Sequence, residues 1–184
     1  MKKIGFIGTG LMGFPMAKNI LKSGYKLKAF NRTLSKVKAL DEFGAEIAIT
    51  LSELVKDSEI IITMLTDDDA IDEVMGSLNF LDNLKPGSIV IDMSSIKPIT
   101  AKKHEKNLSF KKIKYLDAPV SGGTIGAEEG SLAIMIGGEK KVFKEVEDLL
   151  KTMGNPTLVG PVGSGQVSKP VSYTHLTLPT IDPV

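Results

Sequence analysis

The feature that most constrains the fold is a glycine pattern close to the start of the chain. A short apolar segment, Ile4 to Ile7, runs directly into Gly8, Gly10 and Gly13, with the spacing G-x-G-x-x-G. Glycine at the first position permits a tight turn, at the second lets the backbone approach a ligand, and at the third lets a helix pack against the strand. The spacing alone is a weak signal in a chain with 18 glycines, so the neighbouring residues decide its meaning.

The residues after the glycines favour a helix. Met12, Met16 and Ile20 recur at helical spacing and form one apolar stripe, and Gly24 is typical of a helix end. Tyr25 to Phe30 is a plausible second strand. A packed helix after a glycine turn without any ligand is the alternative. Because strand, turn and helix fall in register, we expect the helix N-terminus and its loop to bind a dinucleotide pyrophosphate. The loop residues are Gly8, Thr9, Gly10, Leu11, Met12 and Gly13.

The remainder of the chain alternates strand-like and helix-like segments, which predicts an α/β fold with a mostly parallel, Rossmann-type doubly wound sheet. The clearest buried strand is Glu59 to Leu65. Further predicted strands are Glu46–Ile49, Ser88–Asp92, Ile113–Asp117, Leu132–Ile136 and Thr157–Val159. Predicted helices are Leu34–Phe43, Leu51–Val55, Asp67–Met75 with Asp67 as its cap, a helix from Lys97–Pro98, and Val142–Leu150.

Size and composition narrow the class of protein. The 184 residues allow one ordinary domain with the start of a second, and 42% hydrophobic residues can form a core. A net charge of +1 gives no electrostatic case for nucleic acid or an anionic membrane, and no apolar stretch is long enough to span a bilayer. The absence of cysteine excludes disulfides and thiolate metal sites. We expect a cytoplasmic protein without a metal.

The residues that follow the second predicted strand bear on cofactor choice. In NAD-binding versions of this fold, an acidic residue about 20 positions beyond the glycines binds the ribose 2′-hydroxyl. Here the segment reads Asn31, Arg32, Thr33, and Arg32 is the only arginine of the chain. A guanidinium binds phosphate through two hydrogen bonds. The segment therefore favours NADP, with NAD possible and a solvated loop arginine as the alternative.

A glycine-rich segment, Asp117 to Leu132, follows a later strand. Within it, Ser121, Gly122 and Gly123 offer a hydroxyl and backbone N–H groups, an arrangement suited to a carboxylate. A flexible connector explains the same residues equally well.

Three segments in order resemble the β-hydroxyacid dehydrogenase family. Phe6 to Asn19 resembles the family signature, Asp117 to Leu132 its substrate-binding motif, and Gly163 to Lys169 its catalytic segment. Together they extend from residue 4 to residue 169. The resemblance implies hydride transfer between a nicotinamide cofactor and a short-chain β-hydroxyacid or semialdehyde, and a homo-oligomeric full-length parent.

The resemblance also implies residue roles. Lys169 would be the general acid/base, and Ser121, Gly122 and Gly123 would hold the substrate carboxylate. Ser95 would lie near the nicotinamide, with Met64 and Leu65 bordering the cofactor. An ammonium can supply the proton that carbonyl reduction requires and can stabilise the developing alkoxide. Histidine is the competing donor in other dehydrogenases, but neither His104, in a lysine-rich helix, nor His175, near the C-terminus, is well placed.

The end of the chain departs from the family. The family continues after its lysine with paired asparagines and a long helical domain, whereas this chain has Ser172 and Tyr173 at the asparagine positions. We therefore predict an NADP-binding domain over 1–162 and the start of a linking helix over 163–170. Residues 171–184 lack a helical period and are predicted to be a non-native or disordered tail. A chain without the helical domain is expected to bind cofactor weakly and to turn over slowly or not at all.

Three other functions are compatible with parts of the sequence. Imine reductases share the fold, but Lys169 argues against them because that position usually carries another residue there. Phosphogluconate oxidation is disfavoured by the Thr124–Leu132 stretch. A catalytically silent nucleotide-binding module or fragment is opposed by Lys169 and favoured by the absence of the helical domain.

Overall fold

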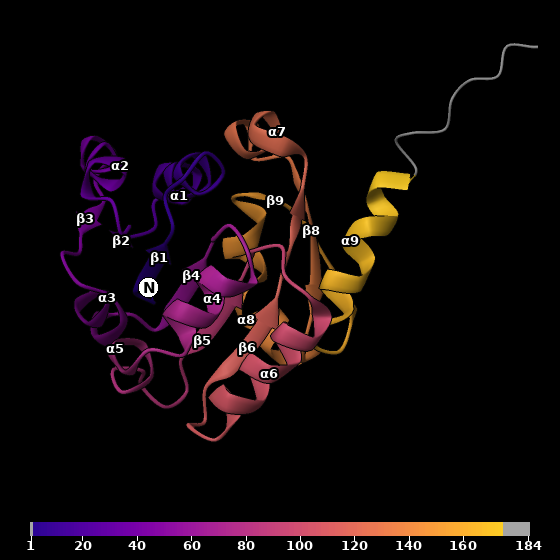
Figure 1. Ribbon diagram of the computed structural model, residues 1–184. Helices are drawn as coiled ribbons and strands as arrows, with labels where there is room; N and C mark the ends of the chain where they lie inside the picture. Colours follow the sequence, from indigo (N-terminus) through magenta and orange to yellow (C-terminus); the bar gives the residue numbers. More distant parts are fainter. Residues whose placement is uncertain (1, 175–184) are drawn as a thin grey trace, which may run out of the picture.

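The computed structural model describes residues 2–174, and their strands form one nine-stranded sheet. Six strands run parallel in the order β3-β2-β1-β4-β5-β6 (Figure 1). This order characterises doubly wound dinucleotide-binding sheets, so the predicted fold class is confirmed. Their bounds are β1 (Ile4–Ile7), β2 (Leu27–Phe30), β3 (Glu46–Ile47), β4 (Ile60–Thr63), β5 (Ile89–Asp92) and β6 (Lys114–Asp117).

Helices cover both faces of this sheet. Because side chains alternate along a strand, Phe6 and Ile62 join one buried cluster while Ile7 and Ile61 join the other. The first cluster includes Met16 of α1, and the second includes residues of α3, α4 and α6. The bounds are α1 (Gly13–Lys22), α2 (Leu34–Lys38), α3 (Leu51–Asp57), α4 (Asp68–Met75), α5 (Leu78–Leu81) and α6 (Pro98–Ser109).

Local sequence signals explain where several helices begin and end. Asp67 accepts a hydrogen bond from the Ala70 N–H at 2.9 Å and caps α4, as predicted. Pro98 lies in the first turn of α6, also as predicted. The helix expected over residues 34–43 is instead α2 followed by a short 3₁₀ turn, Asp41–Phe43. Gly44 ends this turn with a φ of +88°.

The second half of the sheet changes direction. β7 (Val120–Ser121) continues the path of β6, and both pair antiparallel with β8 (Leu132–Gly137), which is parallel to β9 (Gly154–Gly160). Asp117 pairs with Gly137 and Ser121 pairs with Ala133, so the start of β8 lies beyond the carboxyl end of β6. Helix α7 (Gly123–Glu129) therefore projects past the sheet edge (Figure 1), and α8 (Lys140–Lys151) connects β8 to β9.

Two helices differ from the sequence-based expectation. The segment expected to be a nest or a connector contains α7, which is fixed to α1 because the Asn19 Nδ2 donates to the Ala127 carbonyl at 2.8 Å. The last helix, α9 (Ser164–Thr174), extends four residues into the segment expected to lack a helical period. The rest of that predicted tail, residues 175–184, lies outside the described residues.

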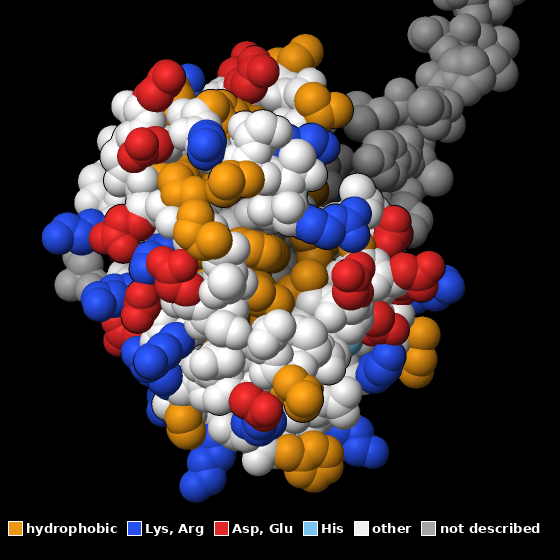
Figure 2. Space-filling view, turned by 60° about the vertical axis from the view of Figure 1, so that its left-hand side comes forward, with side chains coloured by type: hydrophobic (Ala, Val, Ile, Leu, Met, Phe, Trp, Pro, Cys, Tyr) orange, Lys and Arg blue, Asp and Glu red, His pale blue; other side chains and the backbone are white. Residues whose placement is uncertain are grey.

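One face of the molecule has an apolar hollow. Figure 2 shows hydrophobic side chains gathered in the middle of this face, with acidic and basic side chains around them. Two exposed apolar side chains belong to segments that the sequence singled out, namely Leu11 of the glycine loop, 85% exposed, and Ile125 of α7, 69% exposed. Among residues 2–174, no helix is long and apolar enough to cross a membrane.

Candidate active site

The predicted site residues meet at one edge of the sheet. β1 is flanked by β2 on one side and β4 on the other, so the strand order reverses between β1 and β4. Ligands of open α/β sheets bind outside the carboxyl ends of strands at such a reversal. The loops after β1, β4, β5 and β6 all leave the sheet at this edge, because these four strands are parallel.

Packing explains two of the three motif glycines, and the third leaves open space. A Cβ on Gly8, which has a φ of +97°, would lie 2.3 Å from the Met64 carbonyl oxygen. A Cβ on Gly13 would lie 1.9 Å from the Gly8 carbonyl oxygen. A Cβ on Gly10 would have no protein atom within 4 Å. The protein therefore does not itself require glycine at position 10, and the free space fits the close approach of a pyrophosphate.

The segment after β2 is tied to the glycine loop. The Thr9 N–H donates to Asn31 Oδ1 at 3.1 Å, and Asn31 Nδ2 donates to the Thr33 carbonyl at 3.0 Å. The Arg32 side chain is 88% exposed, and its nearest described carboxylate is Glu73 Oε2 at 3.6 Å. Asn31 thus holds the loop, while the charged Arg32 side chain beside it is exposed.

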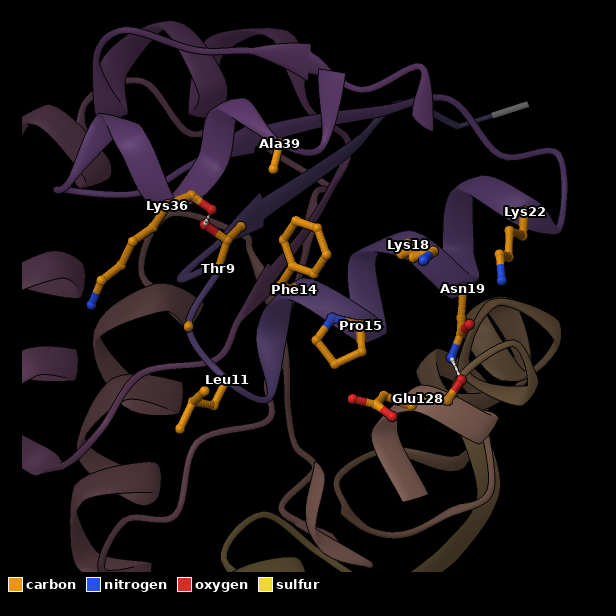
Figure 3. Close-up of a pocket in the computed structure, with 11 residues that line it drawn as sticks. Thr9, Leu11, Phe14, Pro15, Lys18, Asn19, Lys22, Lys36, Ala39 and Glu128 are labelled. Atoms are coloured by element: carbon orange, nitrogen blue, oxygen red, sulfur yellow. Dashed lines mark hydrogen bonds between the residues drawn. The ribbon is translucent and has the colours of Figure 1, made fainter. Parts of the chain in front are cut away.

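A pocket of about 650 Å³ adjoins the glycine loop. Phe14 and Pro15 project toward it from the first turn of α1, with Lys36 on the α2 side and Glu128 on the α7 side (Figure 3). Thr9 Oγ1 donates to the Lys36 carbonyl at 3.2 Å, which holds α2 against the loop. Lys36 is not among the site residues predicted from the sequence; its place four positions after Arg32 was the available signal.

The loops after β4 and β5 are joined by a buried carboxylate. The Leu65 N–H donates to Ser94 Oγ at 2.9 Å, while Asp92 Oδ1 accepts from the Ser94 N–H at 3.0 Å and from Thr63 Oγ1 at 2.9 Å. Tyr115 OH donates to Asp92 Oδ2 at 3.3 Å. Burial raises the pKa of Asp92 to about 6. These hydrogen bonds fix the loop that carries Met64 and Leu65. The Leu65 side chain also lies close to Gly8, near the position that a Cβ on Gly8 would take.

Ser95 and Lys169 are brought together although they are 74 residues apart in the chain. Lys169 Nζ donates to Ser95 Oγ. Ser95 is exposed and Lys169 is partly buried, and this burial lowers the pKa of the Lys169 ammonium. A lysine that loses its proton more readily is better suited to proton transfer near neutral pH.

The helix that carries Lys169 begins at a second buried carboxylate. Asp117 Oδ1 accepts from the Gly163 N–H at 2.7 Å, and Oδ2 accepts from the Gln166 N–H at 3.0 Å. Burial raises the pKa of Asp117, although these hydrogen bonds oppose that shift. Neither Asp117 nor Gln166 is among the site residues predicted from the sequence, because the two residues that meet here are 49 positions apart in the chain.

The remaining predicted site residues lie on the same side of the molecule. Ser121 is in β7, and the exposed Gly122 and Gly123 lead into α7. Helix α9 packs against β8 and also contacts β7, so the segment that carries Ser121 lies next to the helix that carries Lys169.

The histidines lie elsewhere or outside the described residues. His104 is buried between α4 and α6, with Nε2 at 2.8 Å from Asp72 Oδ1, and burial lowers the pKa of this imidazole. It is fixed in the helical layer rather than at the sheet edge. His175 lies outside the described residues.

The strand order and the glycine loop together define a dinucleotide-binding domain. The family described as the NAD binding domain of 6-phosphogluconate dehydrogenase matches residues 3–163. The chain belongs to this family, and its relatives confirm the resemblance to β-hydroxyacid dehydrogenases.

Three relatives illustrate the similarity. The chain is 41% identical to 2-hydroxy-3-oxopropionate reductase of Escherichia coli (strain K12), over 91% of this chain and 58% of that protein. It is 40% identical to 2-(hydroxymethyl)glutarate dehydrogenase of Eubacterium barkeri, over 92% of this chain and 57% of that protein. A solved structure, Mycobacterium tuberculosis 3-hydroxyisobutyrate dehydrogenase with L-serine, has a TM-score of 0.91 at 28% identity, covering 96% of this chain and 60% of that one. The chain thus spans little more than half the length of these relatives.

Proposed function

We propose that this chain forms the nucleotide-binding part of an NADP(H)-dependent oxidoreductase. The reaction is hydride transfer between the nicotinamide and a short-chain β-hydroxyacid or semialdehyde. The observation that carries the proposal is the pairing of Lys169 with Ser95 at the sheet edge where the glycine loop opens. The named activities of the relatives, a reductase and dehydrogenases of small hydroxyacids, support the same class of reaction.

The residues present fit a dinucleotide. The N–H groups of the Gly10–Gly13 loop and the N-terminus of α1 receive the pyrophosphate, into the space beside Gly10. Arg32, with Thr33 beside it, binds the 2′-phosphate of NADP. Asn31 bears no charge that would repel this phosphate, and its amide is engaged with the loop. Met64 and Leu65 border the bound cofactor.

The bound nicotinamide supplies or accepts the hydride. Lys169 donates a proton to the substrate carbonyl oxygen in reduction and accepts it in oxidation. Its positive charge stabilises the alkoxide that develops on that oxygen. Ser95 Oγ holds Nζ in place, and Ser121 with the backbone of Gly122 and Gly123 binds the substrate carboxylate.

Nucleotide binding is the first part of the test. The chain is titrated with NADPH and its melting temperature is followed. A ligand at 100 times its Kd stabilises by about 2.7 kcal/mol, which corresponds to roughly 5–10 °C for a domain of this size. An unchanged melting temperature and unchanged fluorescence would overturn the proposal.

The second part addresses the reaction. Lys169→Ala should keep the nucleotide affinity and lose turnover with a panel of semialdehydes. In the presence of NADP⁺, a hydroxyacid should stabilise the wild-type chain further, and its methyl ester should not. Turnover that survives in Lys169→Ala contradicts the role of the lysine. Nucleotide binding without any turnover or hydroxyacid binding in either protein favours the silent nucleotide-binding module.

A further inference from the structure

We propose that Gln166 is a positioning residue. Its side-chain amide holds the Ser94–Ile96 loop against α9 and thereby keeps Ser95 Oγ within hydrogen-bonding distance of Lys169 Nζ. The inference rests on the proposed function in one respect, that Lys169 is the proton donor. The juxtaposition itself can be measured without turnover.

The Gln166 side chain uses both ends of its amide on this one loop. Nε2 donates to the Ser94 carbonyl at 2.8 Å, and Oε1 accepts from the Ile96 N–H at 3.1 Å. The residue is buried, with 4% of its surface exposed. The amide therefore binds the residues immediately before and after Ser95, which fixes the backbone from which the Ser95 hydroxyl projects.

Gln166 and Lys169 also lie on one face of the helix. Residues three apart in a helix are neighbours on its surface. The Gln166 amide binds the backbone on either side of Ser95, while the Lys169 ammonium meets the Ser95 side chain. One face of α9 thus contacts both the backbone of this loop and the Ser95 side chain. The position of the loop therefore determines whether Ser95 reaches Lys169.

The helix itself is held in place at its first turn. The buried Asp117 carboxylate accepts the Gly163 and Gln166 N–H groups. A Cβ on Gly165 would lie 2.4 Å from the Met135 carbonyl oxygen, so the backbone of α9 packs directly on β8. Because Asp117 fixes the backbone of Gln166, the Gln166 side chain holds the Ser95 loop in a defined position.

The test measures the titration of Lys169 by competitive acetylation. The chain is labelled with limiting acetic anhydride over a pH series, and each lysine peptide is quantified by mass spectrometry. The other lysines are internal references. Ser95→Ala removes an acceptor of the ammonium, so the Lys169 midpoint should fall. Gln166→Met keeps the length of the side chain but loses both hydrogen bonds, and should shift the midpoint in the same direction by at least half as much.

A double-mutant cycle separates positioning from a general structural role. If Gln166 acts through Ser95, Gln166→Met should add no further shift in a Ser95→Ala background. Val167→Ala is the matched control, because Val167 is the next residue of α9 and is 60% exposed; it should leave the midpoint unchanged. Should the methionine variant fail to fold, Gln166→Asn retains a buried amide that is one methylene too short to reach both partners.

The labelling experiment has outcomes that support the inference and outcomes that overturn it. An unchanged midpoint in a folded Gln166 variant, a rise toward the other lysines, or a shift that adds to that of Ser95→Ala would each overturn the inference. Where turnover is measurable, kcat should fall about 10–100-fold with the nucleotide KM little changed. Coupling in the labelling experiment, with a melting temperature and fluorescence that NADPH leaves unchanged, supports the inference while contradicting the proposed function.

Discussion

Asn31 Oδ1 accepts the backbone N–H of Thr9 at 3.1 Å, which joins the residue after β2 to the glycine loop. At this position a carboxylate commonly faces the ribose in NAD-binding domains. Here the side chain is neutral and is occupied on both sides, since its Nδ2 donates to the Thr33 carbonyl. The exposed charge next to this position is that of Arg32, whose side chain is 88% exposed.

Arg32→Ala should discriminate between the two nicotinamide nucleotides. A charge-assisted contact to the 2′-phosphate is worth roughly 10–100-fold in affinity. We expect the NADPH Kd to weaken by that factor while the NADH Kd changes by less than about 3-fold. Fluorescence titration with both nucleotides measures the ratio.

Glu73→Gln is the control for this prediction. The exposed Arg32–Glu73 pair contributes little to stability, and its loss should leave NADPH binding equal or slightly tighter. An equal loss of NADPH and NADH affinity in Arg32→Ala would show that Arg32 does not select for the 2′-phosphate.

Two glycine substitutions should separate folding from binding. Gly10→Ala places its Cβ in open space, so the melting temperature should stay the same, whereas NADPH affinity should fall about 10-fold because the methyl group occupies the pyrophosphate position. Gly13→Ala forces a Cβ to within 1.9 Å of the Gly8 carbonyl oxygen and should cost roughly 1–3 kcal/mol of stability. Wild-type nucleotide affinity in Gly10→Ala would contradict pyrophosphate binding at the glycine loop.

Asp92 should make stability depend on pH. Its pKa is raised from 3.8 to about 6 by burial, so the folded state keeps its proton where the unfolded state has lost it. Stability therefore falls as pH rises from about 4 to about 6, by about 3 kcal/mol if this group acts alone. Above that range both states are ionised, and the contribution of Asp92 stays constant.

Asp92→Asn is the direct test, because an amide can still accept from Thr63 and Ser94. Chemical denaturation of both proteins across this pH range gives the difference in free energy of unfolding. We expect the wild type to lose stability relative to Asp92→Asn as pH rises, and no relative change above pH 7. A difference that is flat over the whole series would show that Asp92 ionises normally.

Asn19 should control the segment that is proposed to bind the substrate carboxylate. Asn19→Leu removes the hydrogen bond to the Ala127 carbonyl, so amide exchange in α7 should accelerate and hydroxyacid binding in the presence of NADP⁺ should weaken. Asn83→Leu, which loses only a local hydrogen bond to the Asn79 carbonyl, should change neither. Unaltered exchange in α7 would mean that other contacts fix this helix.

The strands and helices of the fold could be predicted from the sequence because the signals for each element lie within its own segment. The apolar run of β4 is buried at every residue, and Asp67 caps α4 at the predicted position. The glycine spacing likewise predicted a turn between β1 and α1, where Gly13 is required by its contact with the nearby Gly8 carbonyl oxygen.

The structure of the site depends on contacts that leave no local pattern. Gln166 reaches Ser94 across 72 residues, and Asp117 reaches Gly163 across 46. Helix α7 forms in a segment rich in glycine, which has low helix propensity, because α1 provides it with a docking surface. Such elements follow from tertiary packing, and neither periodicity nor spacing predicts them.

The order of the elements along the chain has a consequence for synthesis. The glycine loop and Ser95 are translated long before Lys169, which follows Ser95 by 74 residues. Because chains emerge from the ribosome N-terminus first, the strand ends around the glycine loop can assemble while Lys169 is still within the ribosome. A nascent chain that already holds a nucleotide would thus still lack α9, and with it the lysine that we propose as the proton donor.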